Sequence, residues 1–513
     1  MAERTRWWAL TAVSLATLMT YLDNNVTNVA LPTIEHSLHL SVSGLEWIVS
    51  SYILVLGGLL LVGGRVADIY GRRRVFLIGL VIFTLSSLAA GLAGSGGELI
   101  AARAVQGLGA ALSMPATLAI LAAAFTNPRE RTAAIGIWGG VGALGLALGP
   151  AVGGLISQHL HWGWIFLLNV PLGAITLAIS IPFIAESRGV QEVAEAGTKP
   201  ATTAARLDIP GLITSAVALF TLTYALIEGG DKGWTSALII GAFAVAAVTF
   251  AAFLVIESRS AYPMIPLRIF RSAALSGGLG TMMIWSFGIL GIYFFTSIYL
   301  QSNLGFSPTK AGLAFVPMAL AIAVAAILSP RVVPVLGANR TVALAMAIMT
   351  AGLVLFVRIG AGATFTDLLP GFLIFGVGAG LMNVPVTNAV IDGAPAAQAG
   401  IASALLNASR EIAGLLGVTV IGAVVRTSES ASLRSGTQPG QAFIDGYHSG
   451  LWLTIGLLAA GVVLSYITLR QRRRPLESVA SGGPATTGGV ASATDQVPPV
   501  AREALRADTT AAP

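Results

Sequence analysis

The chain has 513 residues, of which 55% are hydrophobic and 10% are charged, and its mean hydropathy is +0.81. Soluble domains have about 25% charged residues, so this composition excludes an ordinary soluble protein. Apolar runs of roughly 20 residues recur along most of the sequence, which predicts an all-α protein that crosses a membrane many times. The formal charge of +6 comes largely from basic residues in short segments between those runs, so it does not indicate nucleic-acid binding. The absence of cysteine excludes disulfides and thiol chemistry.

Fourteen membrane-spanning helices are predicted from the apolar runs. Their approximate ranges are 7–30, 44–64, 75–94, 99–124, 132–157, 164–185, 209–228, 236–256, 273–300, 310–329, 340–358, 368–391, 398–425 and 450–469. The chain after Arg470 is basic and then rich in Ala, Gly, Thr and Pro, so residues 471–513 are predicted to form a disordered tail.

Lysine and arginine are distributed unevenly between alternate loops. With the N-terminus in the cytoplasm, the inner segments up to Arg340 hold sixteen of these residues and the tail holds six, whereas the outer loops hold five. Basic residues concentrate on the cytoplasmic side of membrane proteins. The count therefore predicts a multi-pass protein of the cytoplasmic (inner) membrane with both termini in the cytoplasm.

The segment from Gly64 to Arg74 reads GRVADIYGRRR, and part of it is repeated later in the chain. Arg65, Val66, Gly71 and Arg74 recur at the same spacing as Arg331, Val332, Gly337 and Arg340, an offset of 331 − 65 = 266 residues. At about 33 residues for a span and its loop, this offset equals eight spans. It predicts two six-helix halves with two helices inserted between them. The predicted domains are residues 1–186, 187–272 (the inserted helices and linkers), 273–470 and the tail at 471–513.

Two residues of opposite charge lie within predicted spans of the first half. A charge inside a membrane is costly unless it faces the bundle interior and finds a partner, which applies to Asp23 in span one and Arg103 in span four. A desolvated carboxylate can load and release a proton, and a nearby arginine favours its ionised form. Gln106 follows Arg103 by about one turn. We predict that Asp23, Arg103 and Gln106 bind protons or substrate. The alternatives are a structural or capping aspartate near the outer mouth and a static pair for Arg103.

A second charged pair, Arg410 and Glu411, lies in predicted span thirteen. Adjacent residues point about 100° apart on a helix, so these two need not pair with each other. Glu411 could be a second proton or cation site, a partner of Arg103 or of Arg410, or a structural residue. We predict a role in proton or substrate binding for both.

Small residues follow one another along predicted span five: Gly145, Gly149, Pro150, Gly153 and Gly154. Glycines four residues apart let a neighbouring helix approach closely, and a proline within a helix removes a backbone hydrogen bond and kinks it. The pattern predicts a close, kinked packing seam that controls which side of the bundle opens.

The histidines do not provide a proton relay within the membrane, because all five fall in predicted outer loops: His36, His39, His159, His161 and His448. Carboxylates must therefore carry the protons. We find no metal-ligand spacing, phosphate-binding loop or nucleophile constellation. The sequence predicts no enzyme activity, no metal site and no cofactor, with a proton gradient as the energy source.

Several of these segments resemble a known family. Gly64 to Arg73 resembles the loop 2–3 signature of the major facilitator superfamily, and three segments resemble its fourteen-span drug:proton antiporter branch: Leu22–Pro32, Arg103–Gly107 and Gly145–Gly154. Trp164–Phe166 and Asn169–Pro171 also match that branch. Gly163 departs from it, because the branch has arginine there, and this weakens the expected outer-surface charge but not the fold. The resemblance covers roughly residues 10–470.

The resemblance implies a major facilitator fold of fourteen transmembrane helices (6 + 2 + 6). It implies an antiporter that exports small hydrophobic drugs or antibiotics, cationic compounds among them, in exchange for protons. We expect the protein to be a monomer. The resemblance also implies that Asp68 docks against the opposite half, with Gly71 and Arg72 in the same latch, and the alternative is that this loop only sets topology. Other functions remain open: an exporter or symporter of a metabolite or osmolyte, or a membrane receptor or scaffold that transports nothing.

Overall fold

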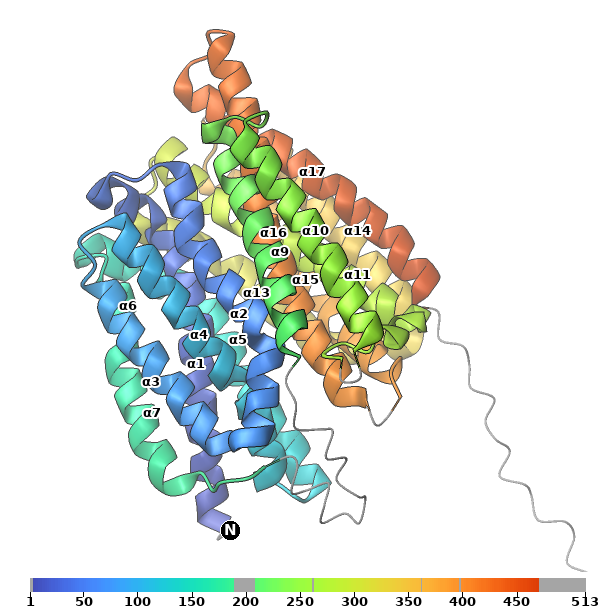
Figure 1. The fold of residues 1–513 in the computed structure, drawn as a ribbon. Coiled ribbons are helices and arrows are strands. Elements are labelled where there is room, and N and C mark those ends of the chain that lie inside the picture. The colour runs from blue at the N-terminus through green and yellow to red at the C-terminus, as the bar shows by residue number, and fades with distance from the viewer. Residues whose placement is uncertain (1–2, 189–207, 261–262, 361, 396–397, 470–513) are drawn as a thin grey trace, which may run out of the picture. The chain divides into compact units, whose positions relative to one another are not determined.

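The computed structural model describes residues 3–188, 208–260, 263–360, 362–395 and 398–469, and in these segments the regular secondary structure is helical (Figure 1). The predicted tail at 471–513 and residues 189–207 of the predicted linker lie outside the described residues. The helices fall into an N-terminal bundle (α1 to α7), an inserted pair (α9 and α10) and a C-terminal bundle (α11 to α17).

The bounds of the helices follow the apolar runs. The N-terminal bundle contains α1 (Glu3–Leu38), α2 (Val42–Tyr70), α3 (Arg72–Gly91), α4 (Gly96–Ala124), α5 (Pro128–His159), α6 (Trp164–Leu167) and α7 (Asn169–Phe183). The inserted pair is α9 (Ile209–Lys232) and α10 (Ala237–Arg259). The C-terminal bundle contains η2 (Leu267–Arg271), α11 (Ala273–Ile298), η3 (Tyr299–Asn303), α12 (Pro308–Ala314), α13 (Val316–Leu336), α14 (Ala338–Val357), α15 (Phe365–Asp392), α16 (Ala399–Arg434) and α17 (Pro439–Thr468).

Local sequence sets many of the helix starts. A side-chain oxygen just before the helix accepts a hydrogen bond from one of the first free backbone N–H groups. The residues that do this are Ser41, Ser95, Asn127, Asp208, Ser236, Ser272 and Ser307.

Thirteen helical segments in the described part of the chain are long and apolar enough to cross a membrane. In three of them two consecutive elements together form one span: α6 with α7, α11 with η3, and α12 with α13. The fourteenth helix is α1, which at 36 residues is long enough to cross but carries polar residues through its middle. The predicted all-α, polytopic fold is confirmed.

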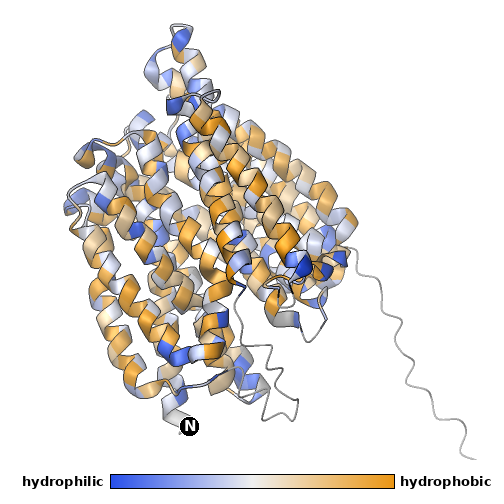
Figure 2. Cartoon of the chain, viewed as in Figure 1, coloured by the Kyte–Doolittle hydropathy of each residue, from blue (hydrophilic) through white to orange (hydrophobic). Residues whose placement is uncertain are grey.

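Many large apolar side chains are exposed. Figure 2 shows that hydrophobic residues predominate along the helices. Val335, Ile327, Leu92 and Val248 are between 67% and 81% exposed. A soluble protein rarely exposes continuous apolar surface on this scale. The hydrocarbon of a bilayer is the environment that suits it.

The two bundles repeat the same packing. In the N-terminal bundle the closest pairs are α2 with α4, α1 with α5 and α3 with α4, and in the C-terminal bundle they are α13 with α15, α11 with α16 and α14 with α15. The most extensive contacts between the bundles are α2 with α16 and α5 with α12. Helix α2 corresponds to the span formed by α12 and α13, and α5 corresponds to α16, so these two contacts are equivalent.

Gly71 and Gly337, which are 266 residues apart, have the same backbone role. Each joins two helices, and each has a positive φ, 113° and 83°, that other residues adopt only with strain. In each case the N–H bonds the carbonyl four residues earlier, on Ala67 or Val333. The repeat in the sequence therefore corresponds to a repeated tight connection.

Two boundaries near the end of the chain were predicted wrongly. Helix α16 continues to Arg434 and α17 begins at Pro439, so Arg426 and His448 lie within helices and not in outer loops. Figure 1 shows the turn between α16 and α17 projecting beyond the neighbouring helix ends. Apolar runs mark only the part of a helix in lipid, so they underestimate helices that extend past it. Below, "near end" means the end of the bundles with the N-terminus and Gly71, and "far end" the opposite one.

Candidate functional site

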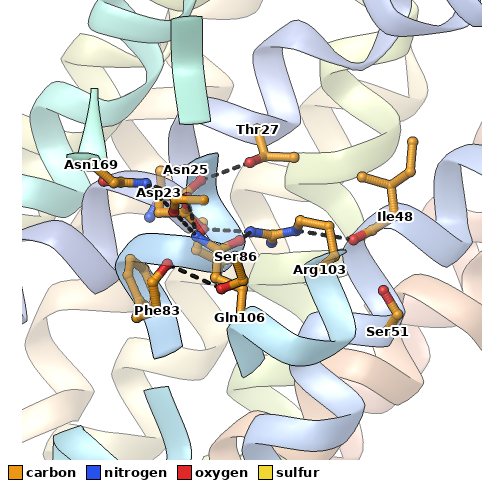
Figure 3. Close-up of polar contacts among 12 residues, drawn as sticks. Asp23, Asn25, Thr27, Ile48, Ser51, Phe83, Ser86, Arg103, Gln106 and Asn169 are labelled. Atoms are coloured by element: carbon orange, nitrogen blue, oxygen red, sulfur yellow. Dashed lines mark hydrogen bonds and ion pairs between the residues drawn. The ribbon is translucent and has the colours of Figure 1, made fainter. Parts of the chain in front are cut away.

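Buried polar side chains from four helices meet inside the N-terminal bundle (Figure 3). Asp23 lies in the middle third of α1, which contradicts a capping role, and its side chain is 0% exposed. Arg103 and Gln106 lie one turn apart on α4, and both are fully buried. Ser87 on α3 and Asn169, the first residue of α7, complete the group, which we call the Asp23 cluster.

The Asp23 carboxylate accepts three hydrogen bonds. Arg103 donates from Nη1 to Oδ2 at 2.5 Å. Gln106 and Asn169 donate from their amide nitrogens to Oδ1 at 2.8 and 2.7 Å. The same two amides reach the Ser87 hydroxyl at 2.7 and 3.2 Å. This is the dense hydrogen bonding that a carboxylate buried away from water requires.

The guanidinium of Arg103 is held from several sides. Its Nε donates to the Ile48 carbonyl at 3.2 Å, and Nη1 also bonds the Gln106 carbonyl oxygen at 2.7 Å. The Tyr52 ring lies 4.2 Å and the Phe166 ring 5.6 Å from its central carbon. Aromatic faces attract a cation that has lost its hydration shell. Arg103 is thus paired with Asp23, which rules out Glu411 as its partner in this conformation.

Within the described part of the chain, three buried atoms in and beside the Asp23 cluster have no hydrogen-bond partner: Arg103 Nη2, Asn169 Oδ1 and the Tyr52 hydroxyl. Unsatisfied buried donors and acceptors cost about 1–3 kcal/mol each. A fully static ion pair would be expected to have its donors satisfied, so the spare atoms suit a group that changes partners.

The glycines of α5 bring α1 into close contact. A Cβ added at Gly145 would lie 2.9 Å from the Leu18 carbonyl oxygen, and one at Gly149 would lie 2.5 Å from the Asn25 Cβ. A Cβ at Gly153 would lie 2.7 Å from the Val26 carbonyl oxygen. No larger residue fits at these positions without displacing α1.

At the far end, the small residues of α5 also contact the C-terminal bundle. A Cβ at Gly154 would clash with the Pro308 carbonyl, and one at Gly312 would clash with the Pro150 carbonyl. Thr309 bonds the Gly154 carbonyl at 3.2 Å through its hydroxyl. Alongside, Ser297 donates to the Asn28 carbonyl at 3.0 Å and Gln301 to the Val29 carbonyl at 2.8 Å. We call these contacts the far-end seam; they hold the two bundles together.

At the near end, Asp68 and Arg72 bond each other at 3.1 Å, and the Asp68 side chain is 40% exposed. The acid that faces a helix N-terminus here is Glu186, whose carboxylate accepts from the backbone N–H groups of Arg73 and Arg74 at 3.1 and 3.3 Å. An anion at a helix N-terminus is favourable. The contact lies within the N-terminal bundle.

Arg410 and Glu411 are half-buried where the bundles face each other. The guanidinium of Arg410 lies 5.5 Å from the Tyr21 ring of α1 and 5.6 Å from the Trp285 ring of α11. Glu411 packs against Gly57 of α2, where an added Cβ would lie 3.2 Å from the Glu411 Cβ. The structure therefore places this pair between the bundles and the Asp23 cluster inside one of them.

Comparison with known proteins identifies the family. The sequence pattern of the Major Facilitator Superfamily matches residues 13–418. This chain is a major facilitator transporter. Its fold agrees with that of solved relatives: the POT family transporter PepTSo has a TM-score of 0.67 at 14% identity, covering 92% of this chain and 98% of that one. A bacterial homologue of the human lysosomal transporter Spinster has a TM-score of 0.61 at 16% identity, covering 92% and 98%.

Several curated relatives of this transporter are named as resistance proteins. A puromycin resistance protein from Streptomyces alboniger is 31% identical over 93% of this chain and 94% of its own length. The multidrug resistance protein Stp of Mycobacterium tuberculosis is 35% identical over 84% and 78%. A methylenomycin A resistance protein from Streptomyces coelicolor is 36% identical over 82% and 86%. The predicted kinship with drug and antibiotic exporters is confirmed.

Some residues at the transporter's polar sites were not singled out from the sequence. Asn169 was noted only as part of a motif, and Ser87 gave no signal because serine is common within apolar helices. Glu46 of α2 and Arg426 of α16 form an ion pair with side chains 0% and 9% exposed. Each lies near the edge of an apolar run, where a charge usually meets water.

Proposed function

We propose that this transporter exports small hydrophobic, drug-like compounds, cationic ones included, in exchange for protons, by alternating access between its two bundles. The observation that carries the proposal is the Asp23–Arg103 pair, because a fully buried carboxylate with exchangeable partners can bind a proton during the cycle. The resistance proteins among the relatives support drugs and antibiotics as the substrate class.

The proposed cycle alternates the partners of Arg103. With Asp23 ionised, Arg103 and Gln106 hold it as described above. When Asp23 takes a proton from outside, its attraction for Arg103 weakens, and the guanidinium turns toward its other neighbours. Release of that proton to the cytoplasm restores the pair. Drug binding between the bundles, beside Arg410 and Glu411, would favour the deprotonated form.

The gating roles follow the same geometry. Gly145, Gly149, Pro150, Gly153 and Gly154 let α5 move as one body with α1 and close against α12. Asp68, Gly71 and Arg72 form the proposed near-end latch, which meets the opposite bundle when the far end opens.

We also propose an orientation: the near end and both termini face the cytoplasm, and the far end faces outward across the cytoplasmic membrane. The distribution of basic residues supports this orientation. We assign residues 1–186 and 273–470 to the moving halves, 187–272 to the inserted helices with their linkers, and we expect the protein to act as a monomer.

The test uses inside-out membrane vesicles with a panel of dyes, cationic antiseptics and antibiotics. We expect drug uptake driven by an imposed proton gradient and abolished by an uncoupler. Asp23→Asn should remove proton-driven uptake while the protein remains in the membrane. Asp392→Asn, at an exposed carboxylate at the end of α15, is the matched control and should transport normally.

Three results would contradict the proposal. Normal proton-driven uptake by Asp23→Asn would remove Asp23 from coupling. Uptake of a metabolite or osmolyte, with no drug of the panel transported, would favour the metabolite or osmolyte carrier, and no transport of any kind would favour a receptor or scaffold.

A further inference from the structure

A second buried ion pair lies at the far end, away from the Asp23 cluster and between the two bundles. Glu46 is in the first turns of α2, and Arg426 is in the last third of α16. The guanidinium Nη1 of Arg426 donates to Oε1 of Glu46. Both residues are at most 8% exposed. The bond therefore joins the N-terminal to the C-terminal bundle across 380 residues of sequence.

The inserted helix α9 completes this contact. Nη2 of Arg426 donates to the carbonyl oxygens of Leu226 and Ile227 at 3.1 Å each. Helix α9 is also tied to α2, because Trp47 donates to Glu228 at 2.9 Å and Ser43 donates to Asp231 at 2.7 Å. One arginine thus holds three helices, one from each part of the fold.

Two glycines make room for the pair. A Cβ on Gly422 of α16 would clash with the Glu46 carboxylate, and a Cβ on Gly230 of α9 would lie 3.2 Å from Arg426 Nε. Each charged group also retains a buried atom with no hydrogen-bond partner among the described residues, Oε2 of Glu46 and Nε of Arg426. A carboxylate buried with an unsatisfied oxygen lowers its cost by accepting a proton on that oxygen.

Other charged groups lie on the elements that pack against α2. On α9 and α16 they are Glu228, Asp231, Lys232 and Glu429. On α4, which also packs against α2, Glu98 bonds the Gly94 backbone and Arg103 is paired with Asp23. The end of α1 and its turn into α2 carry Glu35, His36 and His39, of which both histidines are exposed. Asp231, an acidic residue of α9 whose charge acts on Glu46, is exposed. Protons from the solution at the far end therefore have a short path to Glu46.

We propose that Glu46 is a second proton-binding carboxylate and that the Glu46–Arg426 pair is an outer gate in which the inserted helix α9 takes part. Alternating access requires α2 and α16 to separate at the far end. With both groups charged, separation breaks a buried ion pair. A proton on Glu46 removes that attraction, and Arg426 keeps its two carbonyl partners on α9. Protonation therefore favours the open gate, in which α9 stays with α16 and the hydrogen bonds of Trp47 and Ser43 to α9 are broken.

This inference rests on the alternating access of the proposed function but not on Asp23. The far-end distance is therefore the readout, since it reports gate opening without drug transport. The chain has no cysteine, so two introduced cysteines carry spin labels without background. Leu160, just after α5, and Leu433, near the end of α16, are 54% and 43% exposed and suit labelling.

The experiment measures the label-to-label distance in the purified full chain at about pH 8 and about pH 5.5, a range in which a buried carboxylate can change protonation. In the parent protein we expect the long-distance population to grow at least twofold at the lower pH. Glu46→Gln, which imitates the protonated acid, should show the larger population at both values. Glu130→Gln is the matched control, because it removes one carboxylate of an ion pair to Arg6 within the N-terminal bundle, and it should behave as the parent.

A second variant removes the charges without leaving one of them unpaired. Glu46→Leu with Arg426→Met keeps the volume apolar and should fold. Its far-end distance should not respond to pH. The proposal fails if Glu46→Gln matches the parent at both pH values, or if the double variant keeps the parent's pH response. Loss of drug transport in Asp23→Asn with an intact far-end response would leave this gate standing while supporting the separate coupling site.

Discussion

Asn169 lies 146 residues after Asp23 in the sequence, yet its side-chain amide donates a 2.7 Å hydrogen bond to the Asp23 carboxylate. It thereby brings α7 into the Asp23 cluster, so the helix that ends the N-terminal bundle contacts the proposed proton site directly.

Asn169→Ala tests this contact. Hydrogen bonds to charged groups contribute about 1.5–3 kcal/mol, so the ionised form of Asp23 should lose that support and proton-driven drug uptake should fall roughly tenfold or more. Vesicle uptake at fixed drug concentration measures the effect. Asn339→Ala, which removes an amide bonded to one exposed backbone carbonyl, is the control. Equal uptake by the two variants would mean that Asn169 is not needed for coupling.

Gly149→Ala tests the close contact of α1 with α5. The new methyl group would lie 2.5 Å from Asn25 Cβ, and overpacking costs about 1–3 kcal/mol, so we expect a lower thermal unfolding midpoint and slower uptake. Gly139→Ala on the same helix meets open space and should leave stability unchanged or raise it by about 0.5–1 kcal/mol. If both variants unfold at the same temperature, α1 and α5 do not need this spacing.

Mutations can distinguish the role of Asp68 from that of Glu186. Glu186→Gln weakens the anion at the start of α3 and should reduce stability by about 0.3–1 kcal/mol, with drug uptake preserved. Asp68→Asn breaks only a half-exposed pair within one turn, worth a few tenths of a kcal/mol, so its stability should hardly change. If Asp68 is the near-end latch, uptake should nevertheless fall several-fold. Thermal unfolding and vesicle uptake are measured for both, and normal uptake by Asp68→Asn would reduce the loop to a topology signal.

Glu411→Gln tests which substrates the interface between the bundles accepts. A half-buried carboxylate where the two bundles face each other attracts cationic compounds. Resistance to cationic antiseptics should therefore drop at least fourfold, while resistance to neutral antibiotics is kept. Minimum inhibitory concentrations in cells expressing the variants provide the measurement, with Glu130→Gln as the control. An equal loss for both classes would place Glu411 in coupling or folding instead of substrate choice.

The fold could be predicted largely from the sequence, because apolar runs and one repeated glycine connection report on helix number and order. Asp23, Arg103 and Gln106 could also be predicted to act together, since each is a polar residue in an apolar run and two share a helix face. Their shared contacts with Ser87 and Asn169 depend on tertiary packing, which leaves no periodic signal.

The Glu46–Arg426 ion pair could not be predicted from the sequence. Glu46 is the third residue of one predicted span and Arg426 directly follows another, and charges at the edge of a span usually meet water. Their burial follows from α9 packing over both, and α9 comes from the inserted segment whose position no local pattern reports. The helix bounds of α16 and α17 were missed for the related reason that helices extend beyond lipid.

The enclosure of Asp23 within a single bundle has a kinetic consequence. The described side-chain partners of the Asp23 carboxylate come from α4 and α7 of the same bundle, whereas Arg410 and Glu411 lie between the bundles. If protons bind at Asp23 and drugs bind beside Arg410 and Glu411, as proposed, a drug and a proton never occupy the same atoms. Because drug binding is proposed to favour the deprotonated form, raising the proton concentration should lower the apparent drug affinity through this coupling and not by competition for the same atoms. An inhibitor bound in the drug path should promote release of the proton.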